Sequence, residues 1–250
     1  MSNFQKILDS FTLRDTLNPK IWDNPEDPEK SKMKPKVRKA LMKIANEFID
    51  YLGEDAFVED ITLTGSLSNF NWSEYSDFDL HVIVDLKKFG KQEDTYKELF
   101  NLKKQLFNEK HDIKIFGYDV ELYVQDTEET HFSTGVYSVL YDKWIAEPSP
   151  EDVTIDENKI KQKVDQWMDI IDTTMDNVED EELDDALAEI EKIKDKLKSY
   201  RSAGLEKEGE YSYENLVFKF LRRNGYIQKL FDFTNELMDK RLSLEQEISE

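Results

Sequence analysis

The stretch 64–85, TGSLSNFNWSEYSDFDLHVIVD, joins a Gly-Ser pair to two aspartates that open an apolar run. From Asp77 onward, polar and apolar residues alternate, and this alternation predicts a β-strand. On such a strand Asp77, Asp79 and His81 share one face, while the apolar residues between them share the other. The stretch therefore predicts a buried strand whose first residues present two carboxylates on its polar face.

Two carboxylates this close repel each other, and a neighbouring apolar core makes their charges still more costly. A divalent cation is the usual compensation, and Mg²⁺ prefers carboxylate and phosphate oxygens in octahedral geometry. Asp77 and Asp79 therefore suit a Mg²⁺ ion that also binds a triphosphate. The alternative is a solvated strand end with charged residues and no ligand.

The preceding residues, DITLTGS (60–66), predict a second strand that ends at Gly65. A strand that turns into a helix at Gly-Ser presents free backbone N–H groups and a hydroxyl, which suit phosphate binding. We therefore expect Gly65 and Ser66 to bind phosphate groups.

A third acidic residue should approach from a neighbouring strand. The segment YDVELYV (118–124) alternates Asp119 and Glu121 with apolar residues. We favour Glu121 because it is more central in the strand, with Asp119 as the alternative. The apolar residues change parity across Gly117, which predicts a bulge or tight turn there.

The composition restricts the classes of function. The chain has 250 residues, no cysteine and a formal net charge of −21. Without cysteine, disulfides, thiolate metal sites and a cysteine nucleophile are excluded. The negative charge argues against broad binding to DNA or other phosphate backbones. No stretch approaches the roughly 20 apolar residues of a membrane span, so we expect a soluble, cytoplasmic protein with no membrane partner.

Prolines and periodicity divide the chain into three parts. Residues 1–35 contain four of the six prolines, which disfavour helices and central strands, so we expect an extended N-terminal arm packed on the core. Residues 36–150 carry both strand and helix signals, whereas residues 151–250 carry only amphipathic helical ones. The predicted fold class is α/β (α+β), with a small mixed-sheet core followed by a C-terminal α-helical domain.

The individual elements follow from spacing. Apolar residues three and four positions apart predict a helix over 36–52 and another over 91–111, the latter packing through Tyr96, Leu99, Leu102 and Leu106. The segment 133–145 predicts one further strand. Three helical runs follow, over 156–176, 183–200 and 213–242, the last with Ser212 as its N-cap.

The order of these motifs resembles the DNA polymerase β-like nucleotidyltransferase superfamily. A strand ends in Gly65-Ser66, ten residues (67–76) follow, and Asp77-Phe78-Asp79-Leu80 opens the next strand. The segments LNPKIWD, DVELYVQD and GEYSYENLVFKFLRRNGY are similar, more closely, to a group of proteins of tailed bacteriophages that are classed as nucleotidyltransferases. If the chain is phage-encoded, its place is the host cytoplasm.

The resemblance implies two-metal transfer of a nucleoside monophosphate from a nucleoside triphosphate to a hydroxyl, with release of pyrophosphate. Asp77 and Asp79 would hold two Mg²⁺ ions, for which Mn²⁺ can substitute. Gly65 and Ser66 would bind the β- and γ-phosphates. Glu121 would complete the second metal site and help to deprotonate the acceptor. A small molecule, a protein hydroxyl and an RNA 3′-end all fit as that acceptor.

Basic residues gather at two places in this acidic chain. Lys219, Arg222 and Arg223 lie on one face of a predicted helix. In the superfamily a helical domain often supplies such contacts to the triphosphate, so we expect these three residues to bind the nucleotide. The alternative is an ordinary salt-bridge face. The run KSKMKPKVRK (30–39) is either a solvated arm or a guide for a phosphate-rich acceptor.

The roles of two histidines are undecided, and two alternative functions are also compatible with the sequence. His81 either orients the aspartates or is an ordinary half-buried histidine, and His131 is a candidate for the cleft. The first alternative function is a catalytically inactive nucleotide-binding or protein-interaction module on the same fold. The second is an antitoxin-like nucleotidyltransferase that modifies a partner protein.

Overall fold

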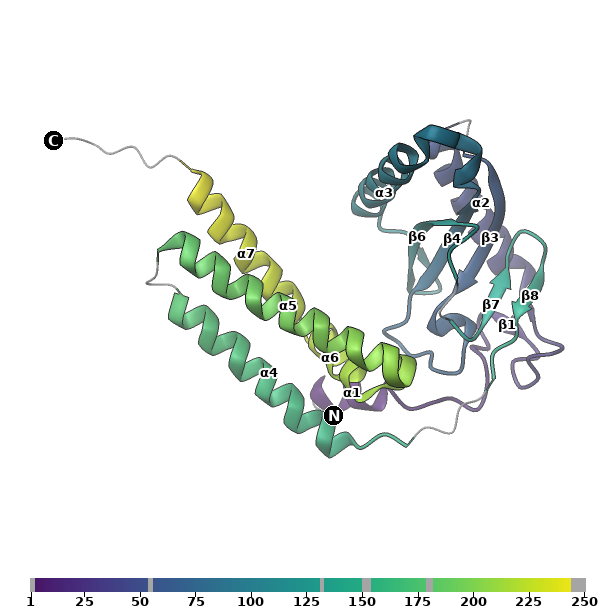
Figure 1. Cartoon of the computed structure of the whole chain (residues 1–250). Coiled ribbons are helices and arrows are strands. Elements are labelled where there is room, and N and C mark those ends of the chain that lie inside the picture. Colours follow the sequence, from purple (N-terminus) through teal and green to yellow (C-terminus); the bar gives the residue numbers. More distant parts are fainter. Residues whose placement is uncertain (1–2, 54–55, 131–132, 150–153, 179–181, 244–250) are drawn as a thin grey trace. The chain divides into compact units, whose positions relative to one another are not determined.

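The structure is a computed structural model that describes residues 3–53, 56–130, 133–149, 154–178 and 182–243. The chain forms two compact units, one of Thr12–Asp152 and one of Met1–Phe11 with Val153–Glu250. The first unit is built around a sheet and the second is helical (Figure 1). The predicted class, a mixed-sheet core followed by a helical part, is confirmed.

The central sheet of the first unit has six strands in the order β5-β6-β4-β3-β7-β8. Strands β4 and β6 are parallel, and the other neighbouring pairs are antiparallel. The strands are β3 (Val58–Thr64), β4 (Phe78–Val84), β5 (Lys114–Ile115), β6 (Tyr118–Asp126), β7 (Val136–Ser138) and β8 (Lys143–Ala146). A separate two-stranded ribbon pairs β1 (Trp22–Asp23) with β2 (Lys32–Met33).

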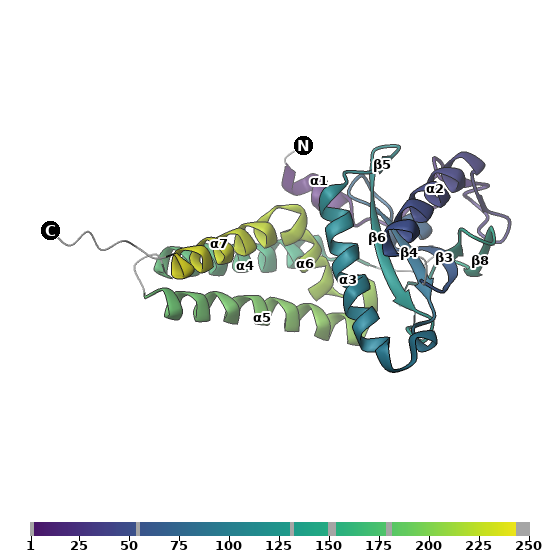
Figure 2. The same ribbon diagram turned by 90° about the horizontal axis from the view of Figure 1, so that it is seen from above.

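Helices α2 (Pro35–Leu52) and α3 (Glu93–Lys110) pack on the sheet beside β4 and β6 (Figure 2). Phe48 of α2 and Phe107 of α3 are buried in one cluster with Phe78 of β4 and Leu122 of β6. A 3-10 segment over Leu86–Gln92 leads from β4 into α3. Because side chains alternate along a strand, the polar residues of β4 and β6 emerge on the face opposite this core.

The proline-rich N-terminal segment is divided between the two units. Leu17, Ile21 and Trp22 are fully buried in the core of the sheet unit, and the Trp22 indole donates a hydrogen bond to the Leu67 carbonyl at 2.8 Å. Helix α1 (Asn3–Asp9) instead packs against α6 in the helical unit. The structure therefore differs from the arm expected over residues 1–35, because residues 3–9 form helix α1 and belong to the helical unit.

The helical unit also contains α4 (Glu157–Val178), α5 (Leu183–Glu208), α6 (Tyr213–Arg223) and α7 (Tyr226–Leu242). Helices α4, α5 and α7 run alongside one another, and α6 packs against all three (Figure 1). The apolar stripes predicted for α4 and α5 are largely buried, for example Trp167 and Ile190. Ser212 caps α6 by accepting the backbone N–H of Asn215, as predicted.

Three predicted elements are wrong in detail. The strand expected over 133–145 is a hairpin of β7 and β8, because Asp142 takes a left-handed backbone conformation and turns the chain. The helical run over 213–242 is two helices, since Gly225 is left-handed and restarts the chain as α7. The gap expected between the helical runs 183–200 and 213–242 shrinks to residues 209–212, since α5 continues to Glu208.

The buried face of α3 also differs from the expectation. Phe100 and Phe107 are buried, whereas Leu99, Leu102 and Leu106 are 39%, 52% and 45% exposed. The aromatic rings bury more area than the leucines would, and Phe100 packs edge-on and tilted against the neighbouring rings of Phe89 and Tyr96. Within the described residues, no helix is both long and apolar enough to span a lipid bilayer.

Candidate active site

The register of three strands brings the acidic residues together. In the parallel pair of β4 and β6, Asp79 lies opposite Glu121. In the antiparallel pair of β3 and β4, Asp79 lies opposite Thr64, the last residue of β3. Asp77 comes immediately before β4 and shares the face of Asp79. Three chain segments distant in sequence therefore meet at one end of the sheet, on its polar face.

Asp77, Asp79 and Glu121 form a compact carboxylate cluster. One oxygen from each residue lies within 4.8 Å of the others. Asp77 and Asp79 are half-buried and Glu121 is exposed, so the cluster opens to solvent. Three carboxylate oxygens at this separation could bind a metal ion, and the donor set is of the hard type that Mg²⁺ and Mn²⁺ prefer.

The structure distinguishes the two candidates for the third acid. Glu121 is a member of the cluster, whereas Asp119 is not. Asp119 is exposed and forms an ion pair of 2.5 Å with Lys114 across the β5–β6 hairpin. That hairpin turns at Phe116 and Gly117, both with positive φ, so the turn predicted at the glycine is confirmed.

Gly65 allows the turn after β3 to pass directly beside the cluster. Its φ of 75° and ψ of −164° lie in a region that essentially only glycine occupies. A Cβ atom at this position would come within 1.8 Å of Asp79 Oδ2. A side chain is therefore excluded twice, by the backbone conformation and by the neighbouring carboxylate.

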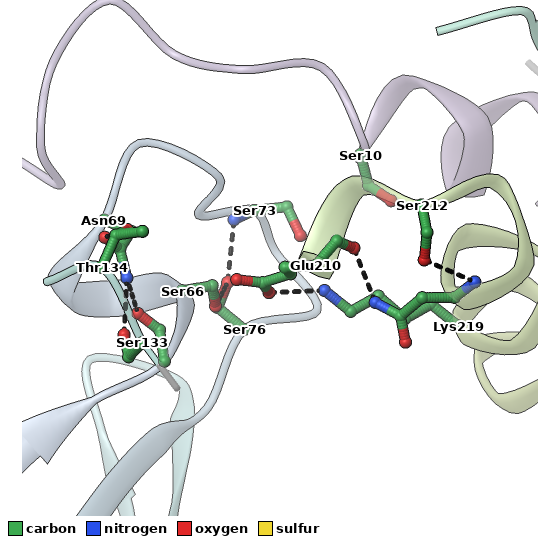
Figure 3. Close-up of polar contacts among 12 residues, drawn as sticks. Ser10, Ser66, Asn69, Ser73, Ser76, Ser133, Thr134, Glu210, Ser212 and Lys219 are labelled. Atoms are coloured by element: carbon green, nitrogen blue, oxygen red, sulfur yellow. Dashed lines mark hydrogen bonds and ion pairs between the residues drawn. The ribbon is translucent and has the colours of Figure 1, made fainter. Parts of the chain in front are cut away.

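A network of short polar side chains holds the turn. The Asn69 amide donates to the Gly65 carbonyl at 2.8 Å, and the Ser68 hydroxyl donates to the same oxygen at 2.9 Å. On the side of the aspartates, the Ser66 hydroxyl donates to Ser76 Oγ at 2.7 Å (Figure 3). Since Ser76 immediately precedes Asp77, Ser66 and the first aspartate are tied into one local structure.

A second line of side chains lies beside the carboxylates on the same face of the sheet. The Tyr123 hydroxyl donates to Glu121 Oε2 at 2.5 Å. The Tyr123 ring stacks on His81 with a centroid distance of 4.8 Å, and His81 Nε2 lies 3.1 Å from Thr64 Oγ1. Burial, followed by the hydrogen bond to Glu121, raises the pKa of the Tyr123 phenol, which therefore stays protonated.

Sequence reasoning missed Tyr123 and Thr64 and left His81 open. The available signal was the two-residue alternation, because Tyr123 follows Glu121 on β6 as His81 follows Asp79 on β4. His131, the other candidate histidine, lies outside the described residues.

Lys219, Arg222 and Arg223 belong to α6 of the helical unit. Lys219 forms a 2.6 Å ion pair with Glu210, which is drawn in Figure 3. Arg223 donates to Ser10 Oγ at 2.6 Å, and Arg222 is exposed. Burial and then the charge of Arg222 lower the pKa of Arg201 on α5, a nearby cation that sequence reasoning missed. Nucleotide binding by the predicted cluster stays a prediction.

Comparisons with known proteins add little to this geometry. No protein-family model and no curated protein matches the chain. Among solved structures, the STING-associated CdnE c-di-GMP synthase from Capnocytophaga granulosa aligns with 12% identity over 96% of this chain and 100% of that chain, with a TM-score of 0.24. A TM-score this low supports no conclusion about the site. The similarity to bacteriophage proteins likewise stays a prediction.

Proposed function

We propose that the protein is a Mg²⁺-dependent nucleotidyltransferase. It would transfer a nucleoside monophosphate from a nucleoside triphosphate to a hydroxyl acceptor. The observation that carries this proposal is the cluster of Asp77, Asp79 and Glu121, with ligand atoms within 4.8 Å of one another. The sharp glycine turn at Gly65 supports the same proposal, because only glycine lets the backbone after β3 approach the Asp79 carboxylate this closely.

The three residues fit a divalent cation such as Mg²⁺ or Mn²⁺, and the proposal places two such ions there. Their three carboxylates are hard oxygen donors, and they crowd negative charge that a cation relieves. Asp77 and Asp79 would hold both ions and Glu121 would complete the second site. When bound, divalent cations in such sites stabilise the negative charge of the attacking and leaving oxygens.

The chain's own groups would perform the remaining tasks. Backbone N–H groups of the Gly65-Ser66 turn would bind the β- and γ-phosphates, and Lys219, Arg222 and Arg223 would add positive charge. The Glu121 carboxylate would accept the proton of the acceptor hydroxyl. A new bond then forms from the hydroxyl oxygen to the α-phosphorus, while the bond from that phosphorus to the leaving oxygen breaks and pyrophosphate departs.

Transfer of label from α-³²P-labelled ATP, CTP, GTP and UTP to a cell extract tests this proposal. The wild type should label an acceptor in the presence of Mg²⁺. Asp77→Asn and Asp79→Asn should each reduce labelling by about 100-fold or more, because each weakens the binding of the cations that would stabilise the transition state. Asp119→Asn is the matched control, since this aspartate lies on the same strand face as Glu121 but outside the cluster.

The outcome also separates the alternatives. Labelling that continues in Asp77→Asn, or that needs no divalent cation, would contradict the proposal. If Mg²⁺·ATP stabilises the wild type against heat but no label is transferred, the inactive nucleotide-binding module is favoured. The labelled species would identify the acceptor as a small molecule, a protein or an RNA.

A further inference from the structure

The outer edge of strand β6 is hydrogen-bonded beside Glu121, the third carboxylate of the cluster. Its neighbour β5 pairs only with the first residues of β6, through Tyr118 and Asp119. Beyond Asp119, the Asn108 side chain of α3 forms the hydrogen bonds at this edge of β6. It donates to the Leu122 carbonyl at 3.0 Å and accepts the Leu122 N–H at 3.1 Å. The backbone next to Glu121 is therefore held as if by another strand.

The ring of Tyr123 is also held in place, by contacts on β4 and α3. Its ring lies nearly parallel to the His81 ring, at an interplanar angle of 19° and a centroid distance of 4.8 Å. The ammonium group of Lys104 on α3 lies 5.2 Å from the centroid of the same ring. Stacking and cation–π contacts each stabilise one ring position, so the hydroxyl of Tyr123 has a defined place.

That hydroxyl bonds to one oxygen of the exposed Glu121 side chain. A free glutamate samples several rotamers about three torsions, and ordering it when a ligand binds costs entropy. A donor that engages Oε2 beforehand removes most of this freedom and leaves Oε1 available. Rigid partners behind a ligating carboxylate commonly raise metal affinity for this reason.

We infer that Tyr123 is a positioning residue, which holds Glu121 in the orientation that completes the carboxylate cluster, with His81 and Lys104 fixing its ring. This inference rests on the proposed function, because it assigns Glu121 to a divalent cation. Tyr123 itself forms no part of the carboxylate cluster and moves no proton.

The test is direct binding of Mn²⁺ to the full-length protein, followed by the electron paramagnetic resonance signal of the free ion. Tyr123→Phe removes one oxygen atom and keeps the ring. We expect its Mn²⁺ affinity to fall by about 10- to 100-fold. Tyr141→Phe is the matched control, because Tyr141 is 60% exposed and its hydroxyl donates to a backbone carbonyl, that of Glu59, at 3.2 Å. Its affinity should stay within about twofold of the wild type.

Two further variants examine how the ring is held. His81→Phe keeps an aromatic surface beside Tyr123, whereas His81→Ala removes it. The inference predicts that His81→Ala weakens Mn²⁺ binding more than His81→Phe does. Circular dichroism melting of each variant confirms that the protein folds, so that a loss of affinity is not mistaken for unfolding.

The outcomes separate the inference from the proposed function. If Asp79→Asn abolishes Mn²⁺ binding while Tyr123→Phe binds as tightly as the wild type, the positioning role is overturned and the metal site stands. If the wild type binds no Mn²⁺ above the level of Asp79→Asn, both are overturned. A loss in Tyr123→Phe that rising Mn²⁺ restores in the labelling assay supports both.

Discussion

At the scale of single residues, Gly65 carries the sharpest constraint in the site. Its backbone conformation strains any other residue, and a Cβ would displace the Asp79 carboxylate. Gly209 allows the backbone strain to be measured apart from the displacement of Asp79. Its conformation is nearly the same (φ 72°, ψ −153°), but a Cβ atom added there would have no atom within 4 Å. The pair therefore isolates the effect of the close approach.

We predict that Gly209→Ala lowers the free energy of unfolding by about 1–3 kcal/mol, the usual range for such backbone strain, and that Gly65→Ala lowers it by at least as much. Only Gly65→Ala should also lose Mn²⁺ affinity, because only there must a carboxylate move. Urea denaturation and the Mn²⁺ titration measure the two effects. Equal Mn²⁺ affinity in the two variants would show that Asp79 has no part in binding the ion.

The acidic residues were predictable from the sequence and their supporting contacts were not. Alternation places Asp77 and Asp79 on one face, and the spacing from Gly65 indicates a shared site. The choice between Asp119 and Glu121 depends on the register with β4, which no local pattern specifies. The contact of Tyr123 with Glu121 depends on a side-chain rotamer that packing against Lys104 and His81 decides.

At the scale of elements, Asp172 of α4 contacts two residues of α7 and so links these two helices. Asp172 of α4 accepts the Tyr226 hydroxyl at 2.8 Å and pairs with Lys229 at 2.6 Å. Burial raises the pKa of this carboxyl, but the hydrogen bonds from Lys229 and Tyr226 outweigh it, so the pKa lies below its ordinary value of 3.8. The charged form is therefore favoured in the folded protein.

This direction fixes the sign of a pH effect. A carboxyl with a lowered pKa stabilises the fold at pH values above its ordinary pKa of 3.8, and the contribution disappears as the pH falls through the lower folded value. Asp172 is 41% exposed, so solvent limits the contribution to about 1 kcal/mol or less.

We predict that Asp172→Asn lowers the stability of the helical unit at pH 7 and has little effect at pH 2. Asp169→Asn, an exposed position on the same helix, is the control and should change stability at neither pH. Urea denaturation followed by circular dichroism measures both variants. An Asp172→Asn deficit that persists unchanged at pH 2 would show that shape, and not charge, holds these helices together.

The elements themselves follow from periodicity wherever one face is clearly apolar. Helix α2 buries Val37, Leu41 and Phe48 as their spacing predicts. Helix α3 has two apolar stripes, and the sequence alone does not say which one meets the sheet. The stripe of Phe100 and Phe107 is buried because of the surrounding aromatic cluster, which is assembled from residues distant in sequence.

At the scale of the whole molecule, the net charge of −21 complicates every experiment with cations. Any divalent ion screens the repulsion among the acidic groups and so stabilises the protein without a specific site. The division into two units provides an internal control, because all three carboxylates of the cluster belong to Thr12–Asp152. A specific site should stabilise that unit alone, whereas screening should stabilise both.

The tryptophans allow the two units to be followed separately. Trp22, Trp72 and Trp144 belong to the sheet unit and Trp167 to the helical unit. In a Trp167→Phe background, fluorescence reports on the sheet unit. Circular dichroism reports mainly on the helical unit, because most of the helical residues belong to that unit and fewer to α2 and α3 of the sheet unit. At a Mg²⁺ concentration 100-fold above Kd, mass action contributes about 2.7 kcal/mol, which is a rise of about 5–10 °C in the melting temperature.

We predict that Mg²⁺ raises the fluorescence transition by this amount and the circular dichroism transition by much less, and that Asp77→Asn/Asp79→Asn removes the difference. If Arg222 and its neighbours bind the triphosphate as proposed, ATP should also raise the circular dichroism transition, because these residues belong to the helical unit. Arg222→Gln should remove this second rise and leave the first. If ATP shifts only the fluorescence transition, the nucleotide is bound by the sheet unit alone, and the basic cluster on α6 serves the packing of its own helices.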